Sequence, residues 1–118
     1  MDILNVLEKA TQINSVSGSE NEIRKFISDN VKKYCDEPSV DAMGNLIAHK
    51  KGSGKKIMFA AHMDEIGIIV TDIDDKGFVR FSSVGGLNLR NLVNLRVRFA
   101  NGVEGVIGAE EESFKDKP

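Results

Sequence analysis

The sequence has little aromatic surface and no capacity for an internal disulfide. It contains one cysteine, one tyrosine and no tryptophan among its 118 residues. Because Cys35 has no partner for a disulfide, a reducing cytoplasmic setting is the expectation. Without tryptophan, the chain offers no evident broad aromatic platform on which bases or sugars would stack.

A charge excess of one sign and long apolar runs are also lacking. Lysine and arginine number 16 against 18 aspartate and glutamate residues, a net charge of −2, so no basic excess exists to neutralise nucleic-acid phosphates. The longest apolar run, residues 57–61, is far too short to span a bilayer. The opening Met1-Asp2-Ile3 has no basic region of the kind that begins a signal peptide. We therefore expect a cytoplasmic protein without nucleic-acid or membrane partners.

What the sequence does contain is a helical first third. Hydrophobic residues make up 41% of the chain, enough for a packed core. Asp2 is placed to cap a short helix, and Ser19 with Glu22 forms an S-x-x-E capping box for a second helix. Pro38 lies beyond the expected end of that helix. Apolar residues recur behind the capping box with the spacing of one helical face: Ile23, Phe26, Ile27, Val31 and Tyr34.

After Pro38 the pattern becomes one of strands. Residues 40–42 and 46–49 flank a turn that contains glycine, and they predict a hairpin. Residues 56–62 form an apolar run that ends in polar residues, which is typical of a central strand buried on both faces. Such strands commonly present functional side chains at their C-terminal ends. This one ends at His62.

The remainder of the chain is β-rich. Residues 67–72 and 78–82 flank a turn in which Gly77 supplies a positive φ angle. Apolar and arginine side chains alternate through residues 95–99, and Asn101-Gly102 predicts a type I′ hairpin into the next strand. The change from a mixed pattern to an all-β pattern places a domain boundary near residues 67–70.

His62 and Asp64 are the main candidates for chemistry. In an extended chain, residues two positions apart lie on the same face. His62 can thus ligate a metal through one ring nitrogen while Asp64 accepts a hydrogen bond from the other, or acts on a nearby water. Taken alone, an H-x-D pattern is also consistent with a structural histidine. Glu65 is expected on the opposite face, as a surface or structural carboxylate.

The other polar residues are interpreted as structural or solvated. No G-x-S-x-G, H-E-x-x-H or C-x-x-C motif occurs. The residues alone therefore predict an α/β segment followed by a β module, with a possible metal ligand at His62. The residues interpreted as structural or solvated are His49, Cys35, the lysines of residues 50–55, Asp72, Asp74, Asp75, Arg90, Arg96, Arg98 and the glutamates of residues 110–112.

The run Ala60-Ala61-His62-Met63-Asp64-Glu65-Ile66-Gly67 resembles the M42 family of metallo-aminopeptidases, the glutamyl and deblocking aminopeptidases. The resemblance covers essentially the whole chain, because further landmarks agree with that family in order and spacing. These are Ser15-Val16-Ser17-Gly18-Ser19-Glu20, Asp41-Ala42-Met43-Gly44-Asn45-Leu46, Gly85-Gly86 and Gly105-Val106-Ile107-Gly108.

The resemblance implies an α/β/α catalytic sandwich interrupted by a PDZ-like β-barrel that serves subunit association. Residues 1–68 would be the N-terminal part of the catalytic domain and residues 69–118 the first part of the barrel. His62 would ligate one of two divalent ions, Zn²⁺ or Co²⁺, and Asp64 would be the catalytic aspartate that orients it. The parent protein would be a homo-oligomer that removes N-terminal residues from peptides with free N-termini.

The family's other metal ligands and its general base have no counterpart within the 118 residues. The resemblance therefore implies the N-terminal portion of a longer aminopeptidase, and this chain alone is expected to be inactive and to bind metal weakly at most. Two alternatives stay open. One is a non-catalytic, β-rich association module. The other is a hydrolase of the kind labelled endoglucanase in this family, which would need two carboxylates flanking a sugar.

Overall fold

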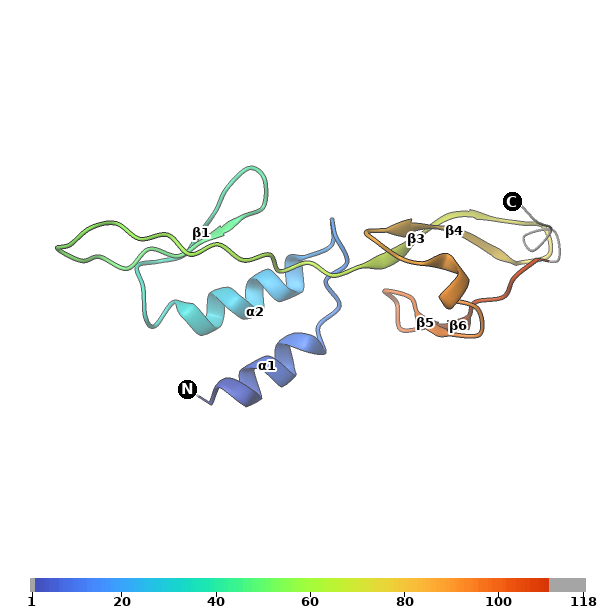
Figure 1. Ribbon diagram of the computed structural model, residues 1–118, viewed down its shortest axis with the longest axis horizontal. Helices are drawn as coiled ribbons and strands as arrows, with labels where there is room; N and C mark the ends of the chain where they lie inside the picture. The colour runs from blue at the N-terminus through green and yellow to red at the C-terminus, as the bar shows by residue number, and fades with distance from the viewer. Residues whose placement is uncertain (1, 111–118) are drawn as a thin grey trace. The chain divides into compact units, whose positions relative to one another are not determined.

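The computed structural model of the protein describes residues 2–110, and the chain divides into two compact units between Gly67 and Ile68. The first unit contains two helices and a short hairpin, and the second contains two longer hairpins (Figure 1). This mixed content agrees with the expected α/β class. Within residues 2–110, no helix has the length and apolar character needed to cross a membrane.

Helix α1 (Ile3–Thr11) begins where the sequence predicts, because Asp2 caps it. One carboxylate oxygen of Asp2 accepts hydrogen bonds from the backbone N–H groups of Leu4 and Asn5, at 3.1 and 3.4 Å. Such a cap satisfies donors that have no partner inside the first helical turn. The start of α1 is thus determined by a purely local interaction.

Helix α2 (Asn21–Val31) carries the expected apolar face but not the expected capping box. Its N-cap is Glu20, one residue after Ser19, and Glu20 makes no side-chain cap. The Glu20 carboxylate instead accepts a hydrogen bond from the backbone N–H of Gly18, and the Ser19 N–H donates to the carbonyl of Val16. The prediction of a Ser19–Glu22 box is therefore wrong, because the turn that leads into α2 already uses these groups.

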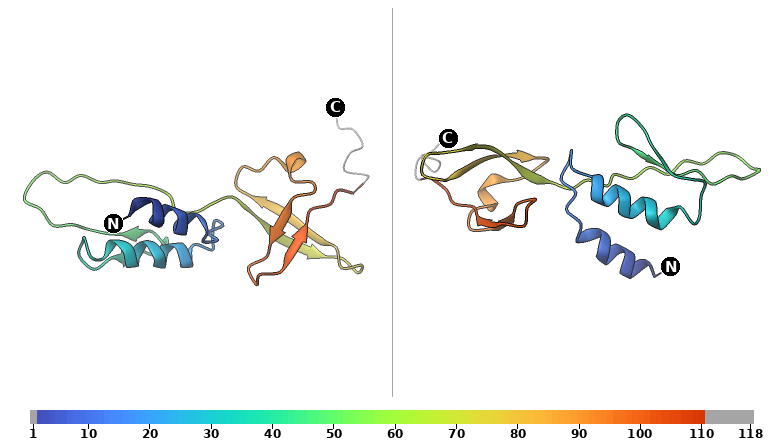
Figure 2. Two further views of the ribbon diagram at one scale, coloured as in Figure 1. Left: turned by 90° about the horizontal axis from the view of Figure 1, so that it is seen from below. Right: turned by 180° about the vertical axis from the view of Figure 1, so that it is seen from behind.

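Helices α1 and α2 of the first unit lie side by side (Figure 2), and apolar residues of both line one surface. Ile23 of α2 is 5% exposed and is the buried apolar residue of this unit. Tyr34 was expected on the helical face, but it follows the helix end in a turn in which its N–H donates to the Val31 carbonyl at 2.8 Å. An open pocket of about 180 Å³ is lined by Val6, Ala10, Phe26, Ile27, Asn30, Val31 and Tyr34.

Strands β1 (Ser39–Val40) and β2 (Leu46–Ile47) form the predicted antiparallel hairpin. Its turn is organised by Asp41, whose carboxylate accepts from the backbone N–H groups of Met43 and Asn45 and from the Asn45 side-chain amide, each at 2.9 Å. Gly44 takes the positive φ of 86° that the turn requires. The Arg24 side chain fastens the turn to α2 by donating to the Gly44 carbonyl at 2.8 Å.

We expect the Asp41 carboxyl to titrate below the usual range for aspartate. The Asn45 side-chain and backbone donors lower its pKa because they favour the charged form. Its contribution to the stability of the turn is complete above the unfolded pKa of about 3.9, and is lost as the pH falls through the lower folded pKa. A carboxyl ¹³C titration checks this. Asn45→Ala should raise the Asp41 pKa and Asn5→Ala should not, so equal curves for both variants would contradict the assignment.

Residues 56–62 do not form the predicted central strand. They have no strand assignment, and Ile57, Met58 and Phe59 are 78%, 88% and 94% exposed. A strand needs a neighbour for its backbone N–H and C=O groups, and the strands on either side of this segment pair elsewhere, β2 with β1 and β3 with β4. In the described part of the chain the segment is therefore an open loop, visible as the long trace between β2 and β3 (Figure 2).

The second unit begins with a predicted hairpin of β3 (Gly67–Ile73) and β4 (Val79–Val84). Asp74 controls its turn: one carboxylate oxygen accepts from the N–H groups of Lys76 and Phe78, at 3.0 and 2.8 Å. Gly77 has the expected positive φ, 83°. Asp74 thus has the structural role in the turn that the sequence predicts.

A short 3-10 helix, η1 (Leu89–Asn91), leads to strands β5 (Arg96–Arg98) and β6 (Glu104–Val106), which pair antiparallel. The hairpin is confirmed, but its turn is not type I′. Gly102 has a φ of 85° whereas Asn101 does not share the positive φ that type I′ requires. The Gly102 N–H donates to the Phe99 carbonyl at 2.8 Å. A type I turn followed by a left-handed glycine fits this three-residue loop.

Candidate functional site

The site is built on a contact between two segments of the first unit that are about fifty residues apart in sequence. Val16 and Glu65 form a parallel β-bridge. The Glu65 N–H donates to the Ser15 carbonyl at 2.9 Å, and the Ser17 N–H donates to the Glu65 carbonyl at 3.3 Å. We call this contact the 15–17/65 clamp. It holds the loop before α2 against the segment that carries His62 and Asp64.

Glu65 completes the clamp with its side chain. Its Oε1 accepts a hydrogen bond from the Ser15 N–H at 2.9 Å, and Ser15 is only 6% exposed. A buried backbone donor needs such a partner, because an unsatisfied one costs roughly 1–3 kcal/mol. Glu65 is therefore a structural carboxylate, one of the two roles that the sequence analysis allowed for it.

Gly67 lets the two segments approach closely. A Cβ atom added there would lie 2.4 and 2.7 Å from the two methyl groups of Val16, much less than a van der Waals contact. Glycine is the residue that permits such an approach. In the sequence, Gly67 stands out only as part of a longer run, since the Val16 contact is not local.

We expect Gly67→Ala to loosen the clamp. Overpacking of this kind costs roughly 1–3 kcal/mol, which corresponds to a roughly 5- to 150-fold increase in the population of the open state. Hydrogen exchange of the Glu65 amide measures that opening. Gly52→Ala is the control, because a Cβ at Gly52 would meet nothing within 4 Å. Unchanged Glu65 exchange in Gly67→Ala would contradict the close approach.

His62 and Asp64 lie together as the i, i+2 spacing predicts. Nδ1 of His62 is 3.0 Å from Oδ1 of Asp64 and 3.1 Å from the Asp64 carbonyl oxygen. Both oxygens are acceptors, so Nδ1 carries the proton in the neutral ring. Nε2 then keeps its lone pair and is free to ligate a metal. The His62 side chain is 85% exposed and that of Asp64 is 39% exposed.

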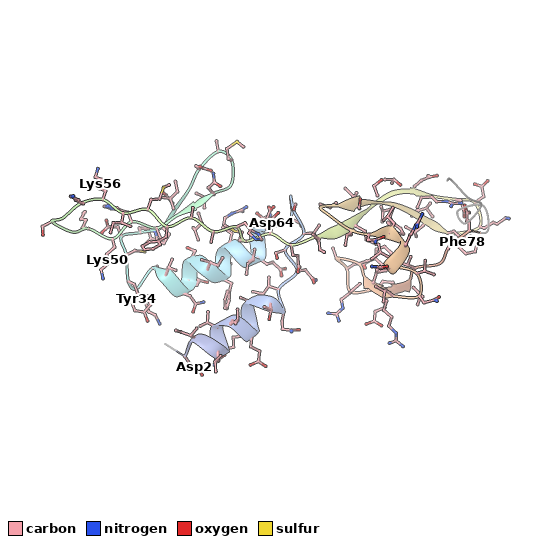
Figure 3. All side chains as sticks on the ribbon, in the orientation of Figure 1. Asp2, Tyr34, Lys50, Lys56, Asp64 and Phe78 are labelled. Carbon is pink, nitrogen blue, oxygen red and sulfur yellow. The ribbon has the colours of Figure 1, made fainter. Side chains whose placement is uncertain are left out.

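Asp64 has a second partner that the sequence analysis missed. The Ser17 hydroxyl donates to Oδ2 of Asp64, so the two carboxylate oxygens serve two different residues. The Ser17 hydrogen bond first, and the His62 hydrogen bond second, hold the pKa of Asp64 below its usual value. Asp64, labelled in Figure 3, thus lies beside the loop that leads into α2. No spacing rule links residues 17 and 64. The one signal in the sequence that pointed to this loop is the Ser15–Glu20 motif of the M42 resemblance.

The arrangement fits one metal ligand with its supporting carboxylate. Histidines that bind metals usually donate their second ring N–H to a carboxylate or a carbonyl, and His62 donates toward both. Within residues 2–110, however, no three His, Cys, Asp or Glu side chains gather as a cluster that would hold an ion. The site is therefore a partial one in the part of the chain that the structure describes.

Several of the remaining polar candidates have structural partners. Nδ1 of His49 lies 3.2 Å from an Asp36 carboxylate oxygen, and the Cys35 thiol donates to the Val31 carbonyl at 3.2 Å. Arg80 pairs with Glu110, whereas Glu111 and Glu112 lie outside the described residues. None of these contacts extends the His62 site.

Comparison with known proteins decides the family. The family model for M42 glutamyl aminopeptidases matches residues 44–118, a stretch that includes His62 and Asp64. The chain belongs to the M42 family. The M42 match begins at the β1–β2 turn and leaves Ser17 outside it.

M42 relatives and solved structures agree over most of this chain. A protein of Acetivibrio thermocellus named "Putative aminopeptidase" is 56% identical over 94% of the chain and 34% of its own length. A Thermotoga maritima crystal structure titled endoglucanase is 40% identical, with a TM-score of 0.81 over 88% of this chain and 34% of that one. The TET1 peptidase of Pyrococcus horikoshii, described as assembling into a tetrahedron or a large octahedral shell, is 41% identical, with a TM-score of 0.76 over 96% and 36% of the two chains.

The chain spans about a third of the length of these relatives. It matches them almost throughout its own length, so the similarity concerns one continuous portion of the family's fold. The mixed helix and strand content of the structure is in keeping with this membership.

Proposed function

We propose that the protein contributes the N-terminal portion of a dinuclear-metal aminopeptidase, which removes N-terminal residues from peptides with free N-termini. The observation that carries the proposal is the geometry of His62 within a chain of the M42 family: Nδ1 is held by Asp64 and Nε2 is free. Because the chain spans about a third of its relatives, the 118 residues by themselves are inactive in this proposal.

His62 would ligate one of two divalent ions, zinc or cobalt, and Asp64 would fix the direction and the basicity of its ring. Bound ions of this kind polarise a scissile carbonyl and lower the pKa of a bound water. The further ligands and the general base are expected in sequence that follows Pro118 in the parent protein. The exposed run of Ile57, Met58 and Phe59 supports this reading, since large exposed apolar surfaces commonly mark places that another part of a protein covers.

The second unit is proposed to be the first part of the inserted PDZ-like barrel, residues 69–118, with a role in association of subunits in the cytoplasm. Its separation from the first unit at Gly67–Ile68 and the large assemblies described for the Pyrococcus horikoshii peptidase support the proposal. A stand-alone association module is the competing reading. Light scattering on the purified chain addresses it, because strict monomers at high concentration would argue against that reading.

The name endoglucanase on the Thermotoga maritima structure raises cellulose cleavage as a second candidate. Glycoside hydrolysis uses two carboxylates about 5–9.5 Å apart that flank the sugar. The Asp64 carboxylate accepts hydrogen bonds from His62 and Ser17, and the Glu65 carboxylate accepts one from the Ser15 N–H. These two carboxylates are therefore not arranged around a sugar. Peptide hydrolysis is the better-supported function, and release of reducing sugar from soluble cellulose by the native protein would reverse that ranking.

The test of the proposed function is made on the native protein, captured from its own cells with an antibody against this chain. We expect an intact mass about three times 12.9 kDa, because the chain covers 34% of its relative. We also expect release of N-terminal residues from unblocked peptides, lost on chelation and restored by Zn²⁺ or Co²⁺. N-acetylated peptides are the control. No release after metal reloading, or equal cleavage of blocked peptides, would contradict the proposal.

We expect Asp64→Asn to weaken Zn²⁺ binding at His62. Loss of a supporting carboxylate typically costs about 10- to 100-fold in metal affinity. The weak binding of the 118-residue chain can be followed through the ring proton signals of its two histidines. Asp36→Asn is the matched control, because Asp36 pairs with His49 in the same way. An equal effect of both substitutions on Zn²⁺ binding at His62 would contradict a supporting role of Asp64.

A further inference from the structure

The Asp64 carboxylate connects two segments, and only one of its oxygens serves the histidine. Oδ1 lies 3.0 Å from Nδ1 of His62, and Oδ2 accepts the Ser17 hydroxyl. Ser17 comes from a loop 47 positions earlier in the chain. The proposed aminopeptidase chemistry uses His62 and Asp64 but gives Ser17 no part.

The backbone around Ser17 is fixed independently of its side chain. Its N–H donates to the Glu65 carbonyl at 3.3 Å, and the residue before it forms the β-bridge with Glu65. The next residue, Gly18, turns the chain with a φ of 90°, and its N–H donates to the Glu20 carboxylate. The clamp therefore holds the backbone of Ser17 where its hydroxyl reaches the Asp64 carboxylate.

Asp64 needs this second contact because its partner His62 is exposed to solvent. The His62 ring is 85% exposed, and neither His62 nor Asp64 lies in a strand. A carboxylate that meets only a solvated ring would exchange among its χ1 rotamers. With Oδ2 held by Ser17, the remaining oxygen faces Nδ1, and the direction of Nε2 follows from it.

We propose that Ser17 is a positioning residue of the M42 site: its hydroxyl fixes the Asp64 carboxylate and, through it, the orientation of the His62 ring toward the metal. The inference rests on the proposed function for its purpose, but the contact itself is a property of this chain. Metal affinity therefore depends on a loop serine that does not touch the metal.

The experiment compares Ser17→Ala, Ser17→Thr and Ser19→Ala in the 118-residue chain. Ser17→Thr keeps the hydroxyl and adds a methyl group at an exposed position. Ser19→Ala is the control, because it removes the hydroxyl of another exposed serine in the same loop. Three-bond couplings to the Asp64 carboxyl carbon report its χ1 rotamer without metal. Zn²⁺ titration of the His62 ring signals reports affinity, and hydrogen exchange of the Glu65 amide shows that the clamp remains closed.

We expect Ser17→Ala to replace one Asp64 rotamer by a mixture and to weaken Zn²⁺ binding roughly tenfold, the lower end of the range for groups that support a ligand. Ser17→Thr should restore both, and Ser19→Ala should alter neither. If Ser17→Ala opens the clamp, the inference is judged on Ser17→Thr and on the wild-type chain. Three-bond couplings in the wild type that are averaged over several Asp64 χ1 rotamers would overturn it.

An unchanged Asp64 rotamer in Ser17→Ala with a closed clamp would also overturn the inference, and would leave the proposed function intact. Conversely, a native protein without metal-dependent peptide hydrolysis would remove the proposed function, while the rotamer measurement would still decide whether Ser17 positions Asp64.

Discussion

The 15–17/65 clamp is the constraint on which the candidate site depends. The candidate residues His62 and Asp64 lie in an extended segment whose own backbone is largely unpaired, so local structure alone would not fix them. Three hydrogen bonds between Ser15, Ser17 and Glu65 supply the missing restraint, and Gly67 permits the approach of Val16 that makes them possible. The clamp also brings the Ser17 hydroxyl to Asp64. A loop that leads into a helix thus organises the end of a distant segment.

The sequence was a good guide to most of the local interactions, although the expected Ser19–Glu22 capping box did not form. The Asp2 cap, the Asp41 and Asp74 turns and the meeting of His62 with Asp64 each involve residues at most four positions apart, and their patterns are readable without a fold. The Asn101-Gly102 hairpin was found for the same reason. Its turn type was not, because Gly102 alone takes the positive φ.

The other failures concern partners that are distant in sequence. Residues 56–62 have the apolar composition of a buried strand, but a strand depends on neighbours, and Phe59 is 94% exposed. The partnership of Ser17 with Asp64 spans 47 residues and follows no periodicity. In the proposed function these observations belong together: the described chain would hold one supported ligand of a two-metal site, and an apolar segment that the rest of the enzyme would cover.

The central claim is that Asp64 fixes the proton of His62 on Nδ1 and leaves Nε2 as the metal ligand. Long-range ¹H–¹⁵N correlation spectra of the wild-type chain test it most directly, at a pH where the ring is neutral, with His49→Gln used to assign the two histidines. The account predicts a protonated Nδ1 and an unprotonated Nε2 for His62. A ring protonated on Nε2, or one that exchanges evenly between the two tautomers, would contradict it.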